Sequence, residues 1–366
     1  MKAGSLIAAA GRVAIAILLA VCYAQLVEGQ VAVPKYEVDP SWPKPLPDTW
    51  VTGNIGGVCV DAHDHVFIAT RSTTDLTDND KEAGGTPSPL IIELDQDGKV
   101  VNSWGDPSVV PLRSHGCTFD GENNIWLAGD QDGDVQKYSH DGKLLLQIGL
   151  KGVLDTSDGT GKGVAMNSST ATLNKPASVA VDPGNGDLYV ADGNGNRRIA
   201  VFDRTGKFLR QWGRQGTKTE ADAGVGGAFM GMLHCATLAN DGLLYVCDRQ
   251  GDRIQVFDKM GSFKRNIWVR SDGIARPDYH GTVLWVAFSP DPAQKFMFVA
   301  DEHYDTIDIF DRATGQLLSS FGRPGHQVGE FIHPHTIALD SKGNMYVAEE
   351  EWGRRVQKFK IVRSSE

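Results

Sequence analysis

Residues 177–213 read ASVAVDPGNGDLYVADGNGNRRIAVFDRTGKFLRQWG and contain four short, largely apolar segments. The stretches between these segments, at 183–187, 193–197 and 203–206, are rich in glycine, asparagine and aspartate. Short apolar segments joined by such turns are typical of antiparallel strands. The stretch therefore predicts one four-stranded antiparallel sheet.

The same pattern of apolar segments and turns recurs along the chain. Five further copies span 58–105, 115–149, 234–269, 284–322 and 335–360. The third segment of each copy ends on a large apolar or aromatic residue: Leu94, Tyr138, Phe202, Phe257, Phe310 and Phe359. Six such copies predict an all-β fold, a six-bladed β-propeller. The last copy lacks a fourth segment, so we expect residues 33–38 to supply it and close the ring.

The N-terminus reads as an export signal. Lys2 and Arg12 precede an apolar run over residues 13–22, which is too short to span a bilayer. We expect a signal peptide over residues 1–29 and a single propeller domain over residues 30–366. The alternative of a lipid anchor at Cys22 is disfavoured, because Val21 is bulky for that processing. The mature protein would be secreted or periplasmic, with no stable membrane span.

The amino-acid composition limits the kinds of molecule that the protein is expected to bind. The net charge is −10, which disfavours nucleic acid because binding it requires a basic face. The four cysteines of the predicted domain mostly lie in apolar segments of different copies, so we expect free thiols rather than disulfides. These residues are Cys59, Cys117, Cys235 and Cys247. The oligomeric state is left open by the sequence.

Three histidines open the first strand in copies two, four and six. They are His115, His234 and His335, and the matching positions of the other copies carry Gly56, Ala177 and Leu284. Alternate blades of a six-bladed ring lie about 120° apart, so the three imidazoles should converge on the axis. Three neutral imidazoles suit Zn²⁺ or another first-row divalent ion, and three protein ligands leave a fourth position open. The alternative is a chance alignment of core histidines.

Other polar residues are candidates for a site at the end of the channel where the three histidines lie. Arg198, Arg253 and Arg355 recur in three copies, so we expect them to pack or to form ion pairs. Arg71 and Arg249 follow second strands and lie outside this recurring set, which makes them candidates to bind an anionic group. His333, two residues before His335, is a rival metal ligand, but its position in the repeat does not match those of the three histidines. The segment 130–134 resembles a calcium loop but lacks its glutamate, so we expect a charged turn. Three turn histidines are expected to be solvated: His63, His65 and His140.

The repeats are similar to NHL repeats, and over residues 50–360 the chain resembles the peptidyl-α-hydroxyglycine α-amidating lyases. That resemblance implies zinc held by His115, His234 and His335, with Arg71 and Arg249 as catalytic arginines. It also implies cleavage of a carbinolamide C–N bond in a small-molecule or peptide substrate, giving an amide and an aldehyde such as glyoxylate.

The chain departs from that family at several points. The catalytic tyrosine of the family falls at Asn194, and Tyr304 is the nearest substitute. The aspartate that holds the family's structural Ca²⁺ is replaced by Thr336. The paired disulfides of the animal enzymes are not expected, and no copper monooxygenase domain is found. Besides a C–N lyase, the sequence leaves open a metal-dependent ester or lactone hydrolase and a non-catalytic interaction propeller.

Overall fold

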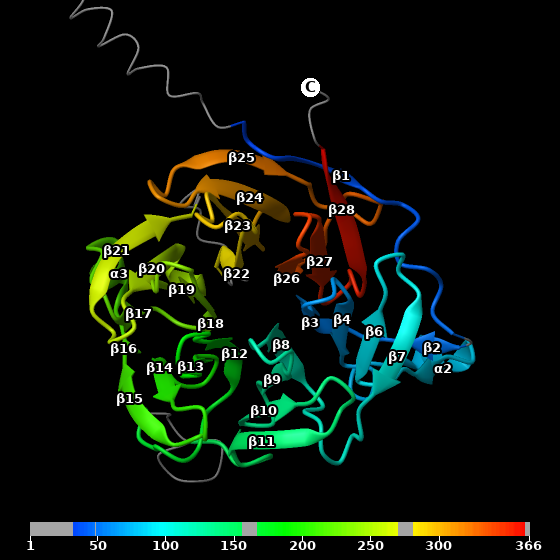
Figure 1. Cartoon of the computed structure of the whole chain (residues 1–366), viewed down its shortest axis with the longest axis horizontal. Helices are drawn as coiled ribbons and strands as arrows, with labels where there is room; N and C mark the ends of the chain where they lie inside the picture. The colour runs from blue at the N-terminus through cyan, green and yellow to red at the C-terminus, as the bar shows by residue number, and fades with distance from the viewer. Residues whose placement is uncertain (1–31, 48, 156–166, 270–280, 363–366) are drawn as a thin grey trace, which may run out of the picture. The chain divides into compact units, whose positions relative to one another are not determined.

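Six four-stranded antiparallel sheets form a ring around a central axis in the computed structural model (Figure 1). The structure describes residues 32–47, 49–155, 167–269 and 281–362. The ring belongs to a compact unit that begins at Lys35. The predicted six-bladed propeller is confirmed, whereas the predicted signal peptide lies outside the described residues.

Each blade contributes one strand to each of four concentric rows. The innermost strands are β3 (Ile55–Val60), β8 (Ser114–Phe119), β12 (Pro176–Val181), β18 (Leu233–Leu238), β22 (Val283–Phe288) and β26 (Pro334–Leu339). The second strands are β4 (Val66–Thr70), β9 (Ile125–Gly129), β13 (Leu188–Asp192), β19 (Leu244–Asp248), β23 (Phe296–Asp301) and β27 (Met345–Glu349).

The outer half of each blade follows the same pattern. The third strands are β6 (Ile91–Leu94), β10 (Asp134–Tyr138), β14 (Arg198–Phe202), β20 (Arg253–Phe257), β24 (Thr306–Asp311) and β28 (Val356–Val362). The outermost strands are β7 (Val100–Trp104), β11 (Leu144–Gly149), β15 (Phe208–Trp212), β21 (Phe263–Trp268), β25 (Leu317–Phe321) and β1 (Lys35–Val38).

The N-terminal strand completes the sixth blade. β1 pairs antiparallel with β28, with Tyr36 opposite Ile361. The ring is therefore closed by hydrogen bonds between the two ends of the unit, as the missing fourth segment of the last copy predicts. β1 thereby covers the outer edge of β28 and gives the sixth blade its fourth strand.

The hydrophobic core lies between neighbouring blades rather than in one central mass. One cluster joins blade 3 to blade 4 and includes Tyr189, Val201, Val246 and Phe257. Others join blades 1 and 2, blades 2 and 3, and blades 6 and 1. Packing between blades covers both faces of these sheets, and the second strands are buried along almost their whole length.

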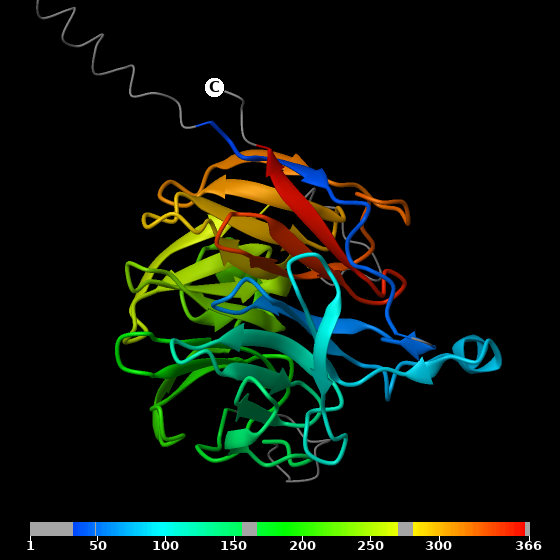
Figure 2. The ribbon, with the colours of Figure 1, turned by 45° about the vertical axis from the view of Figure 1, so that its right-hand side comes forward.

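Short elements extend the loops of two blades. In blade 1, β2 (Trp50–Val51) pairs with β5 (Thr86–Pro87), and α2 (Asp78–Glu82) projects beside them (Figure 2). In blade 4, α3 (Lys218–Asp222) and the parallel pair β16 (Arg214–Gln215) and β17 (Ala228–Phe229) precede the first strand, and the short 3₁₀ helix η1 (Arg249–Gly251) follows the second.

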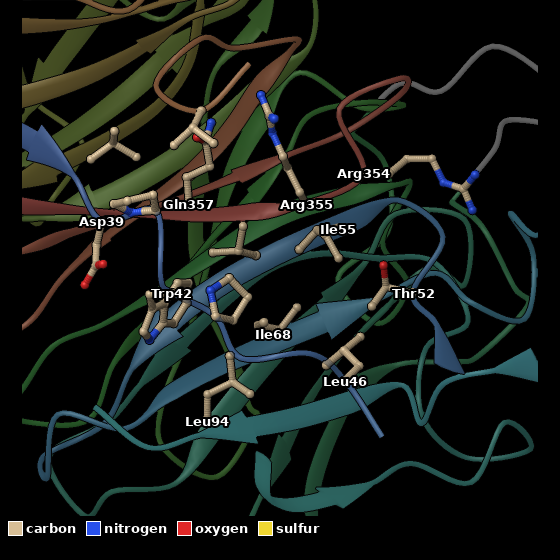
Figure 3. A pocket seen from close by; sticks show the side chains of 15 residues that line it. Asp39, Trp42, Leu46, Thr52, Ile55, Ile68, Leu94, Arg354, Arg355 and Gln357 are labelled. Atoms are coloured by element: carbon tan, nitrogen blue, oxygen red, sulfur yellow. The ribbon is translucent and has the colours of Figure 1, made fainter. Parts of the chain in front are cut away.

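The proline-rich segment after β1 crosses the junction of blades 6 and 1. Trp42 and Leu46 lie over Ile55 and Ile68 there and leave a pocket of about 270 Å³ (Figure 3). None of the three predicted metal ligands lines this pocket. The segment therefore acts as a cover for the core at the point where the ring closes.

The prediction that the cysteines are free was wrong. Cys59 and Cys117 form a disulfide between the first strands of blades 1 and 2, and Cys235 and Cys247 form one within blade 4. The prediction failed because Cys59 and Cys117 belong to different copies of the repeat, and different copies were expected to lie far apart in space. First strands of neighbouring blades in fact lie side by side: a Cβ on Gly57 would be 3.0 Å from the nitrogen of Cys117.

Candidate metal centre

The three repeat histidines meet at the axis. Their ring centroids are separated by 4.5 Å (His115 to His234), 4.7 Å (His115 to His335) and 4.8 Å (His234 to His335). One ring nitrogen from each lies within 4.8 Å of the other two. All three side chains are buried, with exposed fractions of 5%, 1% and 1%. The arrangement is close to an equilateral triangle of donors.

A recurring irregularity in the strands aims these side chains inward. In all six blades the pairing of the first and second strands shifts register at this position, for example between Ser114 and Gly116 in β8. A β-bulge redirects a side chain out of the regular alternation of the sheet. Because the bulge recurs in every blade, the residues at this position all face the channel, and histidine occupies it in alternate blades.

Hydrogen bonds to the intervening blades hold two of the rings. Nδ1 of His115 donates to the carbonyl of Ala177 at 3.1 Å, and Nδ1 of His234 donates to the carbonyl of Leu284 at 2.7 Å. Metal-binding histidines usually donate their second nitrogen to such a carbonyl, which fixes the tautomer. The opposite nitrogen, Nε2, then carries a lone pair, and Nε2 of His234 has no hydrogen-bond partner.

The environment keeps the imidazoles neutral. Burial lowers the pKa of all three histidines, and for His234 and His335 the pKa is well below its ordinary value. The neighbouring histidines lower the pKa of these two further. Three buried, neutral nitrogen donors that face one another fit a first-row divalent ion. The histidine triad could therefore hold a metal.

The tryptophan Trp285 forms the floor beneath the triad. It lies on β22, and a Cβ placed on Gly116 would come within 2.8 Å of its indole ring. Only glycine at residue 116 leaves space for the indole directly below His115. A cavity of about 520 Å³ at the opposite end of the first strands is also lined by Trp285. Sequence reading missed this residue because tryptophan is common in the strands of the fold.

One position of the repeat builds the rim above the triad. The residue that directly follows the second strand is charged in five of the six blades and is glycine in blade 3: Arg71, Asp130, Gly193, Arg249, Glu302 and Glu350. The two predicted arginines thus share a repeat position, on blades that face each other across the ring. The sequence analysis named the arginines but missed the glutamates at the same position.

Each arginine is paired with a glutamate of another blade. Arg71 is fully buried and contacts Oε1 of Glu350 at 2.6 Å, while its Nε donates to the carbonyl of Ser114 at 2.9 Å. Arg249 donates through Nε to Glu302 at 2.8 Å. His333, predicted to be out of register with the triad, lies 3.4 Å from Glu302 through Nδ1.

Glu350 is the anionic group closest to the triad. Its Oε1 lies 3.1 Å from Nε2 of His335 as well as 2.6 Å from Arg71. Burial alone would raise its pKa, but Arg71 and His115 outweigh burial, so the pKa of Glu350 is lowered. The carboxylate is therefore ionised and accepts protons or hydrogen bonds beside the metal-binding atoms.

Asn194 lies where the family tyrosine was expected, and it contacts the triad. Its Nδ2 is 3.2 Å from Nε2 of His115, and its buried Oδ1 has no hydrogen-bond partner. Tyr304 is on the rim loop of blade 5, with its ring packed against His303. Thr336, in place of the family's calcium-binding aspartate, accepts a hydrogen bond from the backbone of Val58 at 3.0 Å. This bond joins blade 6 to blade 1.

Two further sequence interpretations concern structural residues. The recurring arginines were expected to pack or pair, and Arg198 and Arg253 do pair with Asp192 and Asp248 at 2.8 and 2.9 Å. The turn at residues 130–134 is a charged turn in which Arg113 neutralises Asp130 at 3.3 Å.

Comparisons with known proteins agree with this geometry. The NHL repeat model matches residues 173–202, which is most of blade 3. The chain is an NHL-repeat six-bladed β-propeller with distant homology to the amidating enzymes and to NHL repeat-containing protein 3.

Two relatives define that homology. Peptidyl-alpha-hydroxyglycine alpha-amidating lyase 1 of Drosophila melanogaster is 30% identical over 274 residues, which cover 69% of this chain and 45% of the lyase. The chain thus spans less than half the length of that relative. Human NHL repeat-containing protein 3 is 26% identical over 334 residues, which cover 88% of this chain and 84% of that protein.

Solved structures show the same fold. A streptogramin B lyase structure covers 90% of this chain and 98% of its own, with a TM-score of 0.55 and 14% identity. At that identity the likeness shows the propeller and no more. Within the part of the chain that the structure describes, no helix is long and apolar enough to cross a membrane.

Proposed function

We propose that this protein is an exported, metal-dependent lyase that cleaves the C–N bond of a small carbinolamide. The observation that carries the proposal is the triad of buried, neutral imidazoles, His115, His234 and His335, whose ring nitrogens converge at the axis. The relationship to a peptidyl-alpha-hydroxyglycine alpha-amidating lyase supplies the reaction class.

The triad would hold Zn²⁺ or a similar first-row ion. Three imidazoles leave one coordination position for a substrate oxygen, which is the pattern of catalytic rather than structural zinc. A bound ion would act as a Lewis acid that polarises a hydroxyl or carboxylate oxygen of the substrate.

Glu350 is the proton acceptor in this proposal. It is ionised and lies 3.1 Å from Nε2 of His335, so it can reach a substrate hydroxyl placed beside the triad. Removal of the hydroxyl proton forms the C=O bond of the aldehyde, and the C–N electron pair passes to the amide nitrogen. That nitrogen then takes up a proton, which gives the free amide.

The two arginines would orient the glutamates beside the substrate. Arg71 holds Glu350 in place and neutralises part of its charge, and Arg249 does the same for Glu302 across the ring. Each guanidinium group is paired with a glutamate, so the arginines act by positioning these carboxylates at the mouth of the channel. Asn194 has no acidic proton and serves as a positioning residue beside His115.

The two disulfides agree with export of the protein. Two disulfides are typical of proteins that fold in an oxidising compartment, and together with the lyase relationship they indicate an extracellular protein. The apolar N-terminal run predicted as a signal peptide would direct the chain there.

A non-catalytic metal-binding propeller is the second candidate. It is favoured by Asn194 at the position of the family tyrosine and by the nearly full-length match to a protein whose name states only its repeats. The hydrolase alternative has no comparable observation in its favour.

The decisive experiment is an assay with an α-hydroxyglycine peptide and zinc-loaded protein. We expect equimolar glyoxylate and peptide amide, faster than the spontaneous reaction, and no release by the His234→Ala variant. Full zinc occupancy of the triad without any acceleration would reject the lyase and favour the non-catalytic candidate.

A further inference from the structure

A second cluster of metal-ligand side chains lies between blades 1 and 2. It consists of Asp61, Glu93 and His140, which we call the junction cluster. Asp61 directly follows the first strand of blade 1, and Glu93 lies in its third strand. His140 comes from the turn between β10 and β11 of blade 2. The triad is at the start of the first strands, so the two sites lie roughly 15–20 Å apart along the strand direction.

The donor distances match those around a small ion. Nε2 of His140 is 3.3 Å from Oδ2 of Asp61 and 3.4 Å from Oε1 of Glu93. Bonds of about 2.0–2.1 Å in a tetrahedron place neighbouring ligands about 3.3–3.4 Å apart. The separations are also longer than ordinary charged hydrogen bonds of about 2.7–2.9 Å. Three donors thus surround a common point, and a fourth position remains for water.

The cluster has an excess of negative charge. The side chains of Asp61 and Glu93 are 0% and 4% exposed. Across the described residues, histidines are the only basic side chains within ion-pair distance of either carboxylate. Two buried carboxylates are costly without a cation that compensates their charge. A divalent ion would balance both charges.

The same junction elsewhere in the ring is built differently. Between blades 3 and 4, Asp182 occupies the position of Asp61, and Lys259 comes from the turn equivalent to that of His140. Lys259 contacts Asp182 at 2.5 Å, and the residue equivalent to Glu93 there is Val201. Blades 1 and 2 therefore replace a permanent cation with an imidazole and add a carboxylate.

Neighbouring groups hold the donors in place. Nδ1 of His65 lies 2.6 Å from the ligand oxygen of Glu93, and Oδ1 of Asp61 accepts two backbone hydrogen bonds at 2.8 Å. The ring of Phe67 packs edge-on against His140 with centroids 5.1 Å apart. Supporting bonds of this kind orient metal ligands. The expectation that His65 and His140 are merely solvated was wrong, because both contact buried carboxylates that are distant in sequence.

We propose that the junction cluster is a binding site for a first-row divalent cation such as Zn²⁺, which ties blade 1 to blade 2. One imidazole and two carboxylates form a mixed donor set for such ions. The side chain of His140 is 39% exposed, which gives the ion access from solvent. This site does not depend on the proposed lyase activity.

Metal counting tests the proposal directly. Full-length protein is stripped with a chelator, reloaded with Zn²⁺, dialysed and analysed for zinc. We expect roughly two equivalents in the wild type, one in His140→Gln and one in His234→Ala. His63→Gln is the matched control, because its ring is 73% exposed and 3.4 Å from Asp61; it should retain both equivalents. Equal zinc in the wild type and His140→Gln would overturn the proposal.

A second measurement isolates the junction cluster. In the His234→Ala background, saturating Zn²⁺ should raise Tm by about 5 °C, and His140→Gln should abolish the rise. Co²⁺ added to the same variant should give a visible absorption band that His140→Gln removes. If neither Zn²⁺ nor Co²⁺ produces a change that depends on His140, the cluster is a bridged ion pair of a protonated imidazole and the proposal fails.

Discussion

The histidine triad and the junction cluster differ in how the repeat builds them. The triad uses one repeat position three times, on β8, β18 and β26, and its members are alike, neutral and almost fully buried. The junction cluster occurs once among the described residues, uses two carboxylates and one imidazole, and lies where blades 1 and 2 depart from the Lys259–Asp182 pairing of blades 3 and 4. Symmetry produces the first and a local exception the second.

The contrast has a chemical consequence. A site of neutral donors leaves the positive charge of an ion largely uncompensated, so the ion can polarise a substrate. A site with two carboxylates neutralises the ion, which suits stabilisation of the fold more than Lewis acidity. We therefore expect activity to depend on the triad and stability to depend on the junction cluster.

The largest expected effect is the difference in lyase activity between a variant of the histidine triad and a variant of the junction cluster. His234→Ala should reduce glyoxylate release at least 1000-fold, because the axial ion loses one of its three ligands. His140→Gln should change kcat/KM less than twofold. Zinc content and activity are measured on the same preparations, so that loss of zinc at one site can be linked to its effect. Comparable loss of activity in both variants would remove the distinction.

A smaller effect concerns the proton acceptor. Glu350→Gln should lower kcat about 100-fold, in line with the contribution of a general base, while zinc binding at the triad persists. Glu302→Gln is the matched control, because Glu302 occupies the same repeat position and pairs with the other arginine. A fall in KM alone, or an equal fall in kcat for both variants, would argue against this role for Glu350.

A buried carboxylate outside both clusters should respond to protons instead of metal. Burial and the nearby Asp132 raise the pKa of Asp134 to about 7. A carboxyl whose pKa is higher in the folded state than in the unfolded state loses stability as pH rises from about 4 to 7. Asp134→Asn should therefore be more stable than the wild type at pH 8 by about 4 kcal/mol, and equal to it near pH 4.

Denaturant unfolding at both pH values, with and without Zn²⁺, measures this difference. A zinc-dependent change in the effect of Asp134→Asn would show that the carboxylate belongs to a metal site after all.

The smallest expected effect is the difference of about 1 kcal/mol between the costs of removing the two disulfides. Cys59–Cys117 closes a loop with a sequence separation of 58 and lies at the junction of blades 1 and 2, whereas Cys235–Cys247 has a separation of 12 within one blade. Loop entropy predicts a cost of about 4 kcal/mol for replacing the first pair with serine and about 3 kcal/mol for the second. Urea unfolding measures both. Equal costs would mean that zinc or packing already restrains the junction.

The sequence by itself determined the fold and the triad. Both depend on local patterns that repeat: apolar strands separated by glycine-rich turns, and a histidine in the second place of alternate first strands, as at His115 and His234. Repetition converts such patterns into positions in space, because every blade has the same internal geometry. The missing last strand predicted ring closure by β1 for the same reason.

Only the tertiary structure decided the contacts between blades. Cys59 with Cys117, Glu350 with Arg71, and His140 with Asp61 all join residues of different blades that are distant in sequence. A repeat pattern specifies what each blade contains, but which side chains of neighbouring blades touch depends on how the sheets pack and on space left by residues such as Gly57. The packing of the ring therefore created the disulfides, the rim of paired charges and the junction cluster.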